Sequence, residues 1–341
     1  FSYLGCGTAL WVGRQIDSYE GLFYTSAEAF EKKGAKISLE TAVDHIDFDK
    51  KIVYGTKKNG EKFEENYDKL VLATGSLPIS PALAGHDLEG LKFLKLFQEG
   101  QEVDKEISKP EVKEVAVIGA GYIGVEIAEA CLLRGKKVRL FDIAPSSLAS
   151  YYDEWFTEDM DKAISEAGIE THFGEKVLEY KGNGRVSSIV TESGEYPADL
   201  VINAIGFVPN NALGKDHLEL WKNGAYSVDK YQQTSDPDVY AVGDCATIYS
   251  NALRDKTYIA LASNAVRTGI VAGHNIGGTK LEGAGVQGSN AICVFGRKLA
   301  STGLSLNAAK KAGLDVEYTD YEDTQRPAFM KENADVKIRI V

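Results

Sequence analysis

The sequence predicts an α/β fold that contains a parallel sheet. An apolar run, Val115–Ile118, leads into the glycine-rich segment Gly119–Gly124, and a helical pattern and a second apolar run ending on Asp142 follow. A strand, a helix and a second strand in this order are typical of parallel sheets. Two segments, Leu70–Pro78 and Leu200–Pro209, have a similar pattern in which an apolar strand is followed by glycine and proline, as where a chain passes from one domain to the next. Their similarity indicates two related domains, one of which is inserted into the sequence of the other.

The glycine-rich segment has the spacing of a dinucleotide-binding loop. Gly119 allows a tight turn, Gly121 lets the backbone approach a pyrophosphate, and Gly124 allows the helix to pack closely on the strand. The helix that follows offers N–H groups and a positive dipole end to the phosphates. Tyr122 and Ile123 complete the loop. We therefore expect a Rossmann-like domain that binds a dinucleotide.

Asp142 predicts which dinucleotide is preferred. It lies 23 residues after Gly119, at the end of the second strand. A carboxylate at this place accepts hydrogen bonds from both ribose hydroxyls and repels a 2′-phosphate. We expect the site to prefer NADH to NADPH.

Composition excludes several classes of function. The chain has 341 residues and a net charge of −12, without a Lys/Arg cluster, which argues against nucleic-acid partners and anionic membrane surfaces. No apolar run is long enough to span a bilayer. The four cysteines are scattered, which argues against a disulfide framework or a zinc site and favours a reducing, cytoplasmic location.

The chain can be divided into four segments. We expect one domain to be formed by residues 1–80 and 209–284, a second by residues 81–208, and an α+β unit by residues 285–341. Helices are expected after Gly5–Gly7, from an N-cap at Ser26 to Lys33, over 157–167 and over 263–275. Strands are expected at 35–39, 52–54, 70–73, 186–191, 200–204 and 239–242.

Both ends of the chain suggest a longer parent protein. The sequence opens at Phe1 without an initiator methionine and stops at Val341 inside an alternating apolar run that reads as a strand. We expect a piece of a longer protein, in which the final unit is cut short.

Four motifs occur in a characteristic order: Ser2-Tyr-Leu-Gly-Cys6-Gly, Ala73-Thr-Gly-Ser76, the glycine-rich loop with its acid, and Tyr240-Ala-Val-Gly-Asp244-Cys-Ala. Over its whole length the chain resembles the FAD-dependent pyridine-nucleotide disulfide oxidoreductases. Within them it is similar to the single-cysteine branch of NADH oxidases, NADH peroxidases and coenzyme A-disulfide reductases. The resemblance implies two interleaved Rossmann-like domains, one for FAD and one for NADH, with a truncated α+β C-terminal dimerisation domain that forms a homodimer.

Cys6 is the expected catalytic residue. It lies between glycines at an expected helix N-terminus, where the dipole favours the thiolate. Position 11, where a dithiol reductase of this family carries its second cysteine, is Trp11. A single thiolate can cycle through sulfenic acid or a mixed disulfide. The plainer interpretation of Cys6 is a small buried packing residue. Cys131, Cys245 and Cys293 are interpreted as structural.

The resemblance also implies the FAD-binding residues. Asp244 matches the acid that holds the ribityl chain, although by itself it could be an ordinary turn residue. The expected FAD contacts further include Thr74, Gly75, Gly206, Leu261, Ala262 and Ser263. Tyr122 matches a residue that covers the flavin until NADH displaces it, and Glu126 matches a carboxylate close to the flavin. For both, ordinary helix surface is the alternative.

The expected activity is the oxidation of NADH by dioxygen, which is reduced to water through flavin and Cys6. Hydrogen peroxide or coenzyme A disulfide as the acceptor is an alternative on the same scaffold. A non-catalytic redox sensor that binds the dinucleotide is a second alternative. The five histidines lie outside every motif and are interpreted as surface residues.

Overall fold

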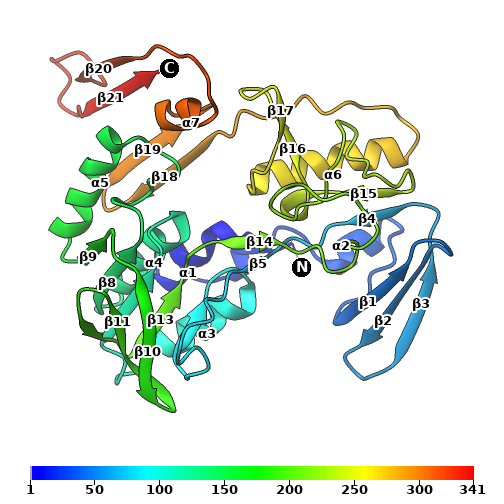
Figure 1. Ribbon diagram of the computed structural model, residues 1–341, viewed down its shortest axis with the longest axis horizontal. Helices are drawn as coiled ribbons and strands as arrows, with labels where there is room; N and C mark the ends of the chain where they lie inside the picture. The colour runs from blue at the N-terminus through cyan, green and yellow to red at the C-terminus, as the bar shows by residue number, and fades with distance from the viewer. Residues whose placement is uncertain (1) are drawn as a thin grey trace. The chain divides into compact units, whose positions relative to one another are not determined.

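The structure, a computed structural model, describes residues 2–341. The chain forms two compact units, each assembled from separate stretches of sequence (Figure 1). Unit 1 comprises residues 1–81, 93–104 and 205–286, and unit 2 comprises residues 82–92, 105–204 and 287–341. The expectation of an α/β fold with a parallel sheet is confirmed. No helix within residues 2–341 combines the length and the apolar character that a membrane span requires.

A five-stranded sheet forms the centre of unit 2, with the strand order β6-β13-β7-β8-β9. Its strands are β6 (Leu91–Phe93), β7 (Glu114–Ile118), β8 (Lys137–Asp142), β9 (Glu170–Phe173) and β13 (Leu200–Asn203). The strands β13, β7, β8 and β9 run parallel to one another. Residues 115–118 are all buried, as expected for a central strand that is covered on both faces.

Helix α4 (Tyr122–Leu133) connects β7 to β8, and α5 (Glu154–Glu166) connects β8 to β9. The buried residues of α4 include the small residues Gly124, Ala128 and Ala130. Small side chains allow the helix axis to approach the strands closely. The helix is followed by Gly135 with a φ of +72°, the left-handed conformation that commonly ends helices.

Arg139 is a charged residue inside the parallel sheet, with only 5% of its surface exposed. Its guanidinium forms ion pairs with Glu114 at 2.6 Å and with Glu170 at 2.9 Å, and both glutamates lie on the neighbouring strands. A buried charge is tolerated when it is paired and hydrogen-bonded. These pairs therefore join β7, β8 and β9 across the sheet.

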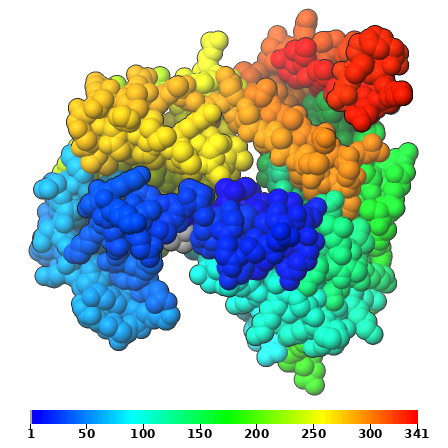
Figure 2. Space-filling model, turned by 180° about the vertical axis from the view of Figure 1, so that it is seen from behind, coloured from blue at the N-terminus to red at the C-terminus, as the bar shows by residue number. Residues whose placement is uncertain are grey.

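The remaining elements of unit 2 are small antiparallel sheets and one short helix. They are β10 (Val177–Asn183), β11 (Arg185–Thr191), β12 (Glu195–Pro197), β18 (Asn290–Val294), β19 (Arg297–Ser301), α7 (Leu306–Lys311), β20 (Thr319–Thr324) and β21 (Asp335–Ile340). Every residue of β20 is exposed, and the β20–β21 hairpin is visible as a red lobe on the surface in Figure 2.

Unit 1 is built from its three stretches of sequence, residues 1–81, 93–104 and 205–286. Its strands are β1 (Thr41–Asp47), β2 (Ile52–Lys57), β3 (Lys62–Asn66), β4 (Leu70–Leu72), β5 (Ser76–Pro78), β14 (Phe207–Pro209), β15 (Val239–Ala241), β16 (Ile248–Ser250) and β17 (Asp255–Thr257). Its helices are α1 (Thr8–Val12), α2 (Ala27–Glu31) and α6 (Ala262–Ile276), while α3 (Phe97–Ile107) continues into unit 2.

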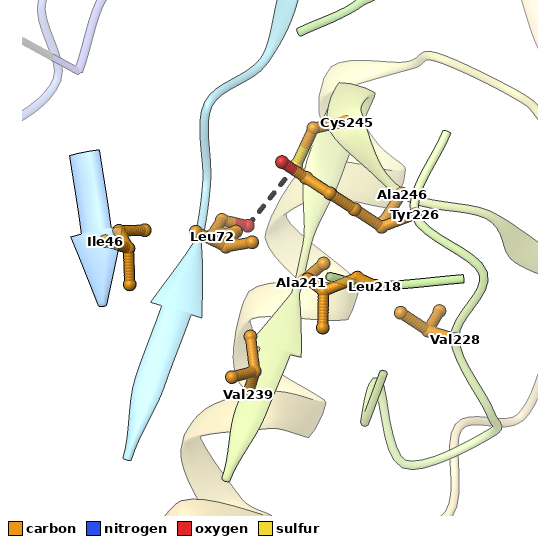
Figure 3. Packing of buried hydrophobic residues seen from close by; sticks show 9 residues of the cluster. All are labelled: Ile46, Leu72, Leu218, Tyr226, Val228, Val239, Ala241, Cys245 and Ala246. Atoms are coloured by element: carbon orange, nitrogen blue, oxygen red, sulfur yellow. Dashed lines mark hydrogen bonds between the residues drawn. The ribbon is translucent and has the colours of Figure 1, made fainter. Parts of the chain in front are cut away.

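The core of unit 1 joins strands that are distant in the sequence. Leu72 on β4 and Ala241 on β15 belong to one buried cluster, and these two strands pair in parallel (Figure 3). The thiol of Cys245, which is also buried, lies 3.3 Å from the carbonyl oxygen of Leu72 and donates to it. This core fixes the short 3-10 turn Gly243–Cys245, which carries Asp244.

The two segments with a similar sequence pattern, Leu70–Pro78 and Leu200–Pro209, pair with each other in the structure. In the first segment, β5 forms an antiparallel ladder with β14 of the second. Thr74 Oγ1 donates to the carbonyl oxygen of Asn210 at 2.5 Å, and the Asn210 backbone N–H donates to that of Gly75 at 2.9 Å. The segments that follow the two buried strands are therefore joined within unit 1 by a two-stranded ladder.

Most expected elements are present, with shifted ends. Ser26 accepts a hydrogen bond from the Ala29 N–H as the N-cap of α2, but this helix ends at Glu31. The strand expected at 35–39 is wrong. That segment is irregular, and the strand starts at Thr41, where pairing with β2 begins. Within residues 2–341 no strand pairs with the short alternation Ala-Lys-Ile-Ser-Leu to provide the backbone hydrogen bonds that a strand requires.

Candidate functional site

The glycine-rich loop joins β7 to α4 in unit 2 with the close packing that its spacing predicts. Gly119 has a φ of +101°, and its N–H donates to the carbonyl oxygen of Phe141 at 2.7 Å. A Cβ atom at position 124 would lie 1.7 Å from the carbonyl oxygen of Gly119. No side chain fits there without moving the backbone, so Gly124 is required for the contact between helix and loop.

The first turn of α4 presents backbone N–H groups without a side-chain cap. Gly121 is the N-cap residue, in an extended conformation, and no side chain bonds to the helix end. The first N–H groups of a helix have no partner within it and, with the helix dipole, favour an anion. A Cβ on Gly121 would meet only the ring of Tyr151, at 3.9 Å, so the backbone is open to close approach. Ile123 completes this half-buried turn. The residues fit a pyrophosphate.

Asp142 has a role in the loop that the spacing did not reveal. Its Oδ2 accepts from the Ala120 N–H at 2.5 Å, and its Oδ1 accepts from the Ala144 N–H at 2.7 Å. The carboxylate therefore ties the glycine-rich loop to the end of β8. Each carboxylate oxygen has a second lone pair, so both can still accept from ribose hydroxyls.

Tyr122 and Glu126 lie one turn apart on α4, and neither is ordinary exposed helix surface. The phenol of Tyr122 is hydrogen-bonded to two side chains of unit 2, Tyr152 and Asn290. Burial, together with the nearby charge of Glu129, raises the pKa of Glu126 to about 7. A carboxyl that titrates near neutral pH can hold or release a proton under physiological conditions.

Cys6 lies in unit 1, in the 3-10 turn Gly5–Gly7 that precedes α1. It is exposed, so the interpretation as a buried packing residue is wrong. Thr8 Oγ1 donates to the carbonyl oxygen of Gly5 at 2.7 Å and also bonds the phenol of Tyr3. Burial raises the pKa of Tyr3, and the charge of the Cys6 thiolate raises it further. Because α1 has only five residues, its dipole is a smaller aid to the thiolate than expected.

An aromatic cluster supports the Cys6 turn. The ring of Phe97 on α3 lies 5.1 Å from that of Tyr3, 6.0 Å from Trp11 and 5.0 Å from Phe23, measured between ring centroids. Tyr19 contacts both Trp11 and Phe97. Such packed rings hold the backbone on either side of the thiol in place.

Asp244 lies in the turn after β15, and its carboxylate is held by residues from other parts of unit 1. Its Oδ2 accepts from Ser76 Oγ and from Lys95 Nζ, both at 2.9 Å, and its carbonyl oxygen accepts from the Tyr258 hydroxyl at 2.9 Å. The reading as an isolated turn residue is therefore wrong. Lys95 was not singled out in the sequence, because no local motif marks it.

Lys95 connects the Asp244 region with the cysteine turn. Its Nζ lies 4.0 Å from the centre of the Phe207 ring, next to Gly206. A Cβ on Gly5 would lie 3.8 Å from the carbonyl oxygen of Lys95. The structure therefore places the residue before Cys6 beside the lysine that pairs with Asp244.

The N-terminal end of α6 is also uncapped by any side chain. Leu261 is the N-cap residue, and Ala262 and Ser263, which form the first turn, are exposed. The Gly243 N–H donates to Thr268 Oγ1 of α6 at 3.1 Å, which fixes the helix beside the Asp244 turn. With Thr74 and Gly75, these groups offer hydroxyl acceptors and N–H donors, as a ribityl chain and a flavin ring require. The residues fit FAD.

A family model described as pyridine nucleotide-disulphide oxidoreductase matches residues 1–269. The chain belongs to this family. The expectation from the sequence motifs is confirmed.

Individual members of the family are similar to the chain over nearly its whole length. A protein named NADH oxidase from Lactococcus lactis subsp. cremoris is 63% identical over 343 residues, which cover 100% of this chain and 77% of the relative. The water-forming NADH oxidase from Lactobacillus brevis, solved with NADH bound, superposes with a TM-score of 0.95 at 37% identity, covering 99% of this chain and 75% of that one. A CoA-dependent NAD(P)H sulfur oxidoreductase from Pyrococcus furiosus is 33% identical, over 97% of this chain and 72% of the relative.

Two expectations about other residues of this pyridine nucleotide-disulphide oxidoreductase need correction. Cys131 and Cys245 are buried, but Cys293 is exposed on β18, because alternate side chains of that strand face solvent. His172 is no surface residue, since its ring stacks on Phe141 and its side chain is 13% exposed. Within residues 2–341 no group of three or more His, Cys, Asp or Glu side chains could hold a metal ion.

Proposed function

We propose that this protein is an FAD-dependent NADH oxidase that reduces dioxygen to water. The observation that carries the proposal is the 63% identity to a protein named NADH oxidase across the whole chain. The similarity to the water-forming enzyme of Lactobacillus brevis supports the product. When bound, FAD would accept hydride from NADH and pass electrons to dioxygen.

The FAD is held in unit 1 by the groups around Asp244. The Asp244 carboxylate, kept in place by Ser76 and Lys95, accepts from ribityl hydroxyls. Thr74, Gly75 and Gly206 lie in the two paired segments, and the open N–H groups at Leu261, Ala262 and Ser263 favour negative charge on the flavin.

The NADH is held in unit 2. Its pyrophosphate lies on Gly119, Gly121 and Gly124 and on the first turn of α4, which includes Tyr122 and Ile123. Asp142 accepts from the ribose and at the same time fixes the loop through the Ala120 N–H. We assign Glu126, whose pKa is raised, to the reacting end of the bound nucleotide.

Cys6 completes the reduction of oxygen. Its thiolate attacks one oxygen of hydrogen peroxide, an S–O bond forms, the O–O bond breaks, and the departing hydroxide takes a proton to become water. The resulting sulfenic acid accepts two electrons and a proton that derive from a second NADH. The S–O bond then breaks, the thiolate is restored and a second water leaves. The exposure of Cys6 supports this role.

We also propose which segments of the chain bind each cofactor and which segment forms the homodimer. Residues 1–80 and 209–284 bind FAD, residues 81–208 bind NADH, and residues 285–341 take part in a homodimer. The two compact units support the first two assignments, since residues 1–81 and 205–286 form one unit, but residues 93–104, which include Lys95, belong to that same unit and not to the one with the glycine-rich loop. Exposed apolar side chains such as Phe329 and Ile340 support a protein contact in the last segment. The four cysteines, none in a disulfide, favour the cytoplasm.

Reduction of a sulfur compound is the main alternative, because the CoA-dependent sulfur oxidoreductase of Pyrococcus furiosus is similar over 97% of the chain. Measurement of NADH and oxygen consumption by the full-length protein distinguishes the two. Water formation consumes two NADH per dioxygen, and catalase leaves this ratio unchanged. A peroxide-forming enzyme consumes one and returns oxygen with catalase. Turnover that requires coenzyme A disulfide or added peroxide would contradict the proposal.

A further inference from the structure

His172 on β9 lies between two carboxylates of unit 2. Its Nδ1 is 3.0 Å from Glu175 Oε2, and its Nε2 is 3.0 Å from Glu170 Oε1. A neutral imidazole has one N–H and can donate to only one of these oxygens, whereas an imidazolium donates to both. The arrangement therefore fits the charged form of the ring, which joins the two glutamates.

Aromatic side chains hold the His172 ring in this orientation. It stacks on Phe141 of β8, with 4.5 Å between ring centroids and 7° between the planes, and the Tyr196 ring of β12 meets it edge-on at 4.4 Å. The charged and titratable side chains around the ring include Glu170 and Glu175, the phenol of Tyr196, and Arg139 of β8, which pairs with Glu170 at 2.9 Å. The ring is thus fixed where both of its nitrogens meet an acceptor.

Glu175 is the partner that links His172 to other strands. Its side chain is only 12% exposed. Its second oxygen, Oε1, accepts from the hydroxyl of Thr191 on β11 and from the Tyr196 hydroxyl at 3.3 Å. Buried carboxylates need such partners. With its side chain bonded on both oxygens, Glu175 is held in one place.

The backbone of the same segment is bonded to the end of β8. The Glu175 N–H donates to the carbonyl oxygen of Asp142 at 2.9 Å, and the Gly174 N–H donates to that of Ala144 at 2.8 Å. The Asp142 carboxylate in turn accepts from the Ala144 N–H. Both carbonyl groups belong to the turn that carries this carboxylate, so residues 174–175 help to fix where it lies.

We propose that His172 is a positioning residue for the adenosine half of the coenzyme. By donating to Glu170 and Glu175 at once, the charged ring holds the segment after β9 against the end of β8 and keeps the Asp142 carboxylate in place for the ribose. When the ring loses its second proton, one carboxylate loses its donor and the turn is held less firmly. Coenzyme binding and protonation of the ring therefore favour each other. This inference rests on the proposed binding of NADH at the glycine-rich loop.

The first test is the pH dependence of ADP-ribose binding to the full-length protein, measured by calorimetry. This probe carries the ribose expected at Asp142 and has no nicotinamide. Histidine changes charge between about pH 5 and pH 8, and the double contact requires the protonated ring. The affinity should therefore fall about 2- to 30-fold between about pH 5.5 and about pH 8.5, as for a residue that acts through another. A constant affinity over this range would overturn the inference.

The second test is His172→Phe, which keeps an aromatic ring on Phe141 and removes both hydrogen bonds. At about pH 5.5 it should bind ADP-ribose about 2- to 30-fold more weakly than the wild type, and its affinity should no longer depend on pH. The KM for NADH should rise by a similar factor with kcat unchanged, because hydride leaves from the other half of the coenzyme. The matched control is His217→Phe in unit 1, where the ring stacks on Phe48 and meets one carboxylate, that of Asp236. It should behave like the wild type.

Glu126 also titrates near pH 7, so the pH series is repeated in Glu126→Gln, where the fall in ADP-ribose affinity should persist. A fall that disappears in Glu126→Gln, or that persists in His172→Phe, would overturn the inference alone. So would a His172→Phe variant in which kcat falls and the KM does not rise. A wild type that binds neither ADP-ribose nor NADH would overturn the proposed function, and this inference with it.

Discussion

The nucleotide loop of unit 2 and the Asp244 region of unit 1, which we propose as the two cofactor sites, are built in different ways. The first is one continuous stretch, in which Asp142 closes back on Ala120. The second brings together Ser76, Lys95 and Asp244, and Asp244 is separated from the other two by 168 and 149 residues. A site made from neighbouring residues depends on local backbone geometry. A site made from distant residues depends on the folded core that aligns them.

The largest effect on stability and NADH binding is expected at Gly124, because the glycine-rich loop leaves no space for a side chain there. Gly124→Ala should lower Tm by several degrees and weaken NADH binding at least tenfold, because the Cβ would lie 1.7 Å from the Gly119 oxygen and the backbone must shift. Gly121→Ala is the matched control. Its Cβ has space, so Tm should change little while NADH binding weakens. Calorimetry and NADH titration measure both effects. Equal loss of stability in both variants would contradict the different roles of the two glycines.

Asp142 tests whether the loop acid acts on the coenzyme or only on the backbone. Asp142→Ala removes the two hydrogen bonds that hold the loop and also the proposed acceptor of the ribose hydroxyls. Because a hydrogen bond to a charged group is worth about 1.5–3 kcal/mol, loss of the ribose contact should raise the KM for NADH by about 10- to 100-fold. It should also narrow the gap between NADH and NADPH, since repulsion of the 2′-phosphate is lost. Steady-state kinetics with both coenzymes checks this. A lowered activity with an unchanged NADH/NADPH ratio would restrict Asp142 to a structural role.

Substitution of Lys95 tests the Asp244 region, which is built from residues distant in the sequence. Lys95→Met keeps the length of the side chain but leaves Asp244 without its cationic partner, and we expect FAD to be retained about tenfold less tightly. Lys109→Met, which removes the ion pair with Glu106, is the control and should retain FAD normally. Flavin absorbance after dialysis gives the result. Equal retention in both variants would show that Lys95 does not orient Asp244.

The smallest expected effect is on the pH dependence of stability, through Glu126. The pKa of Glu126 is about 7 in the folded protein, above its usual value of 4.5, chiefly because of burial. The protonated form is therefore favoured by folding, and this stabilisation is fully present below pH 4.5 and is lost as pH rises to about 7. Glu126→Gln should flatten the decrease in Tm between about pH 4.5 and about pH 7 by removing this titration. The same slope in the variant and the wild type would contradict the assignment.

The two sites differ in how much of each could be predicted from the sequence. The spacing of Gly119, Gly124 and Asp142 predicted the loop, because strand, turn and helix follow one another without interruption. The bond from Asp142 to Ala120 was missed, since spacing does not show which oxygen faces the backbone. Lys95 and Asn290 could not be recognised, because each meets its partner only when segments far apart in the sequence come together in the fold. His172 was placed on the surface because its stacking on Phe141 depends on the register between β8 and β9.

Cys6 was singled out for a reason that the structure only partly supports. The five-residue α1 offers a small dipole, whereas exposure and the aromatic cluster around Phe97 leave the thiol accessible on a fixed turn. Its chemistry is the central claim, because the remaining residues only bind and orient the cofactors. Cys131 and Cys245 are buried and serve as controls for the loss of a thiol.

The most direct test measures the product made by Cys6→Ser in the full-length protein, with NADH and oxygen consumption followed together with a peroxidase-coupled dye assay. The wild type should consume two NADH per dioxygen and release no hydrogen peroxide. Cys6→Ser should keep NADH-dependent flavin reduction, consume one NADH per dioxygen and release peroxide, because no thiolate is present to accept its oxygen. Cys131→Ser and Cys245→Ser should behave like the wild type. A Cys6→Ser variant that oxidises NADH and still makes only water would contradict the account.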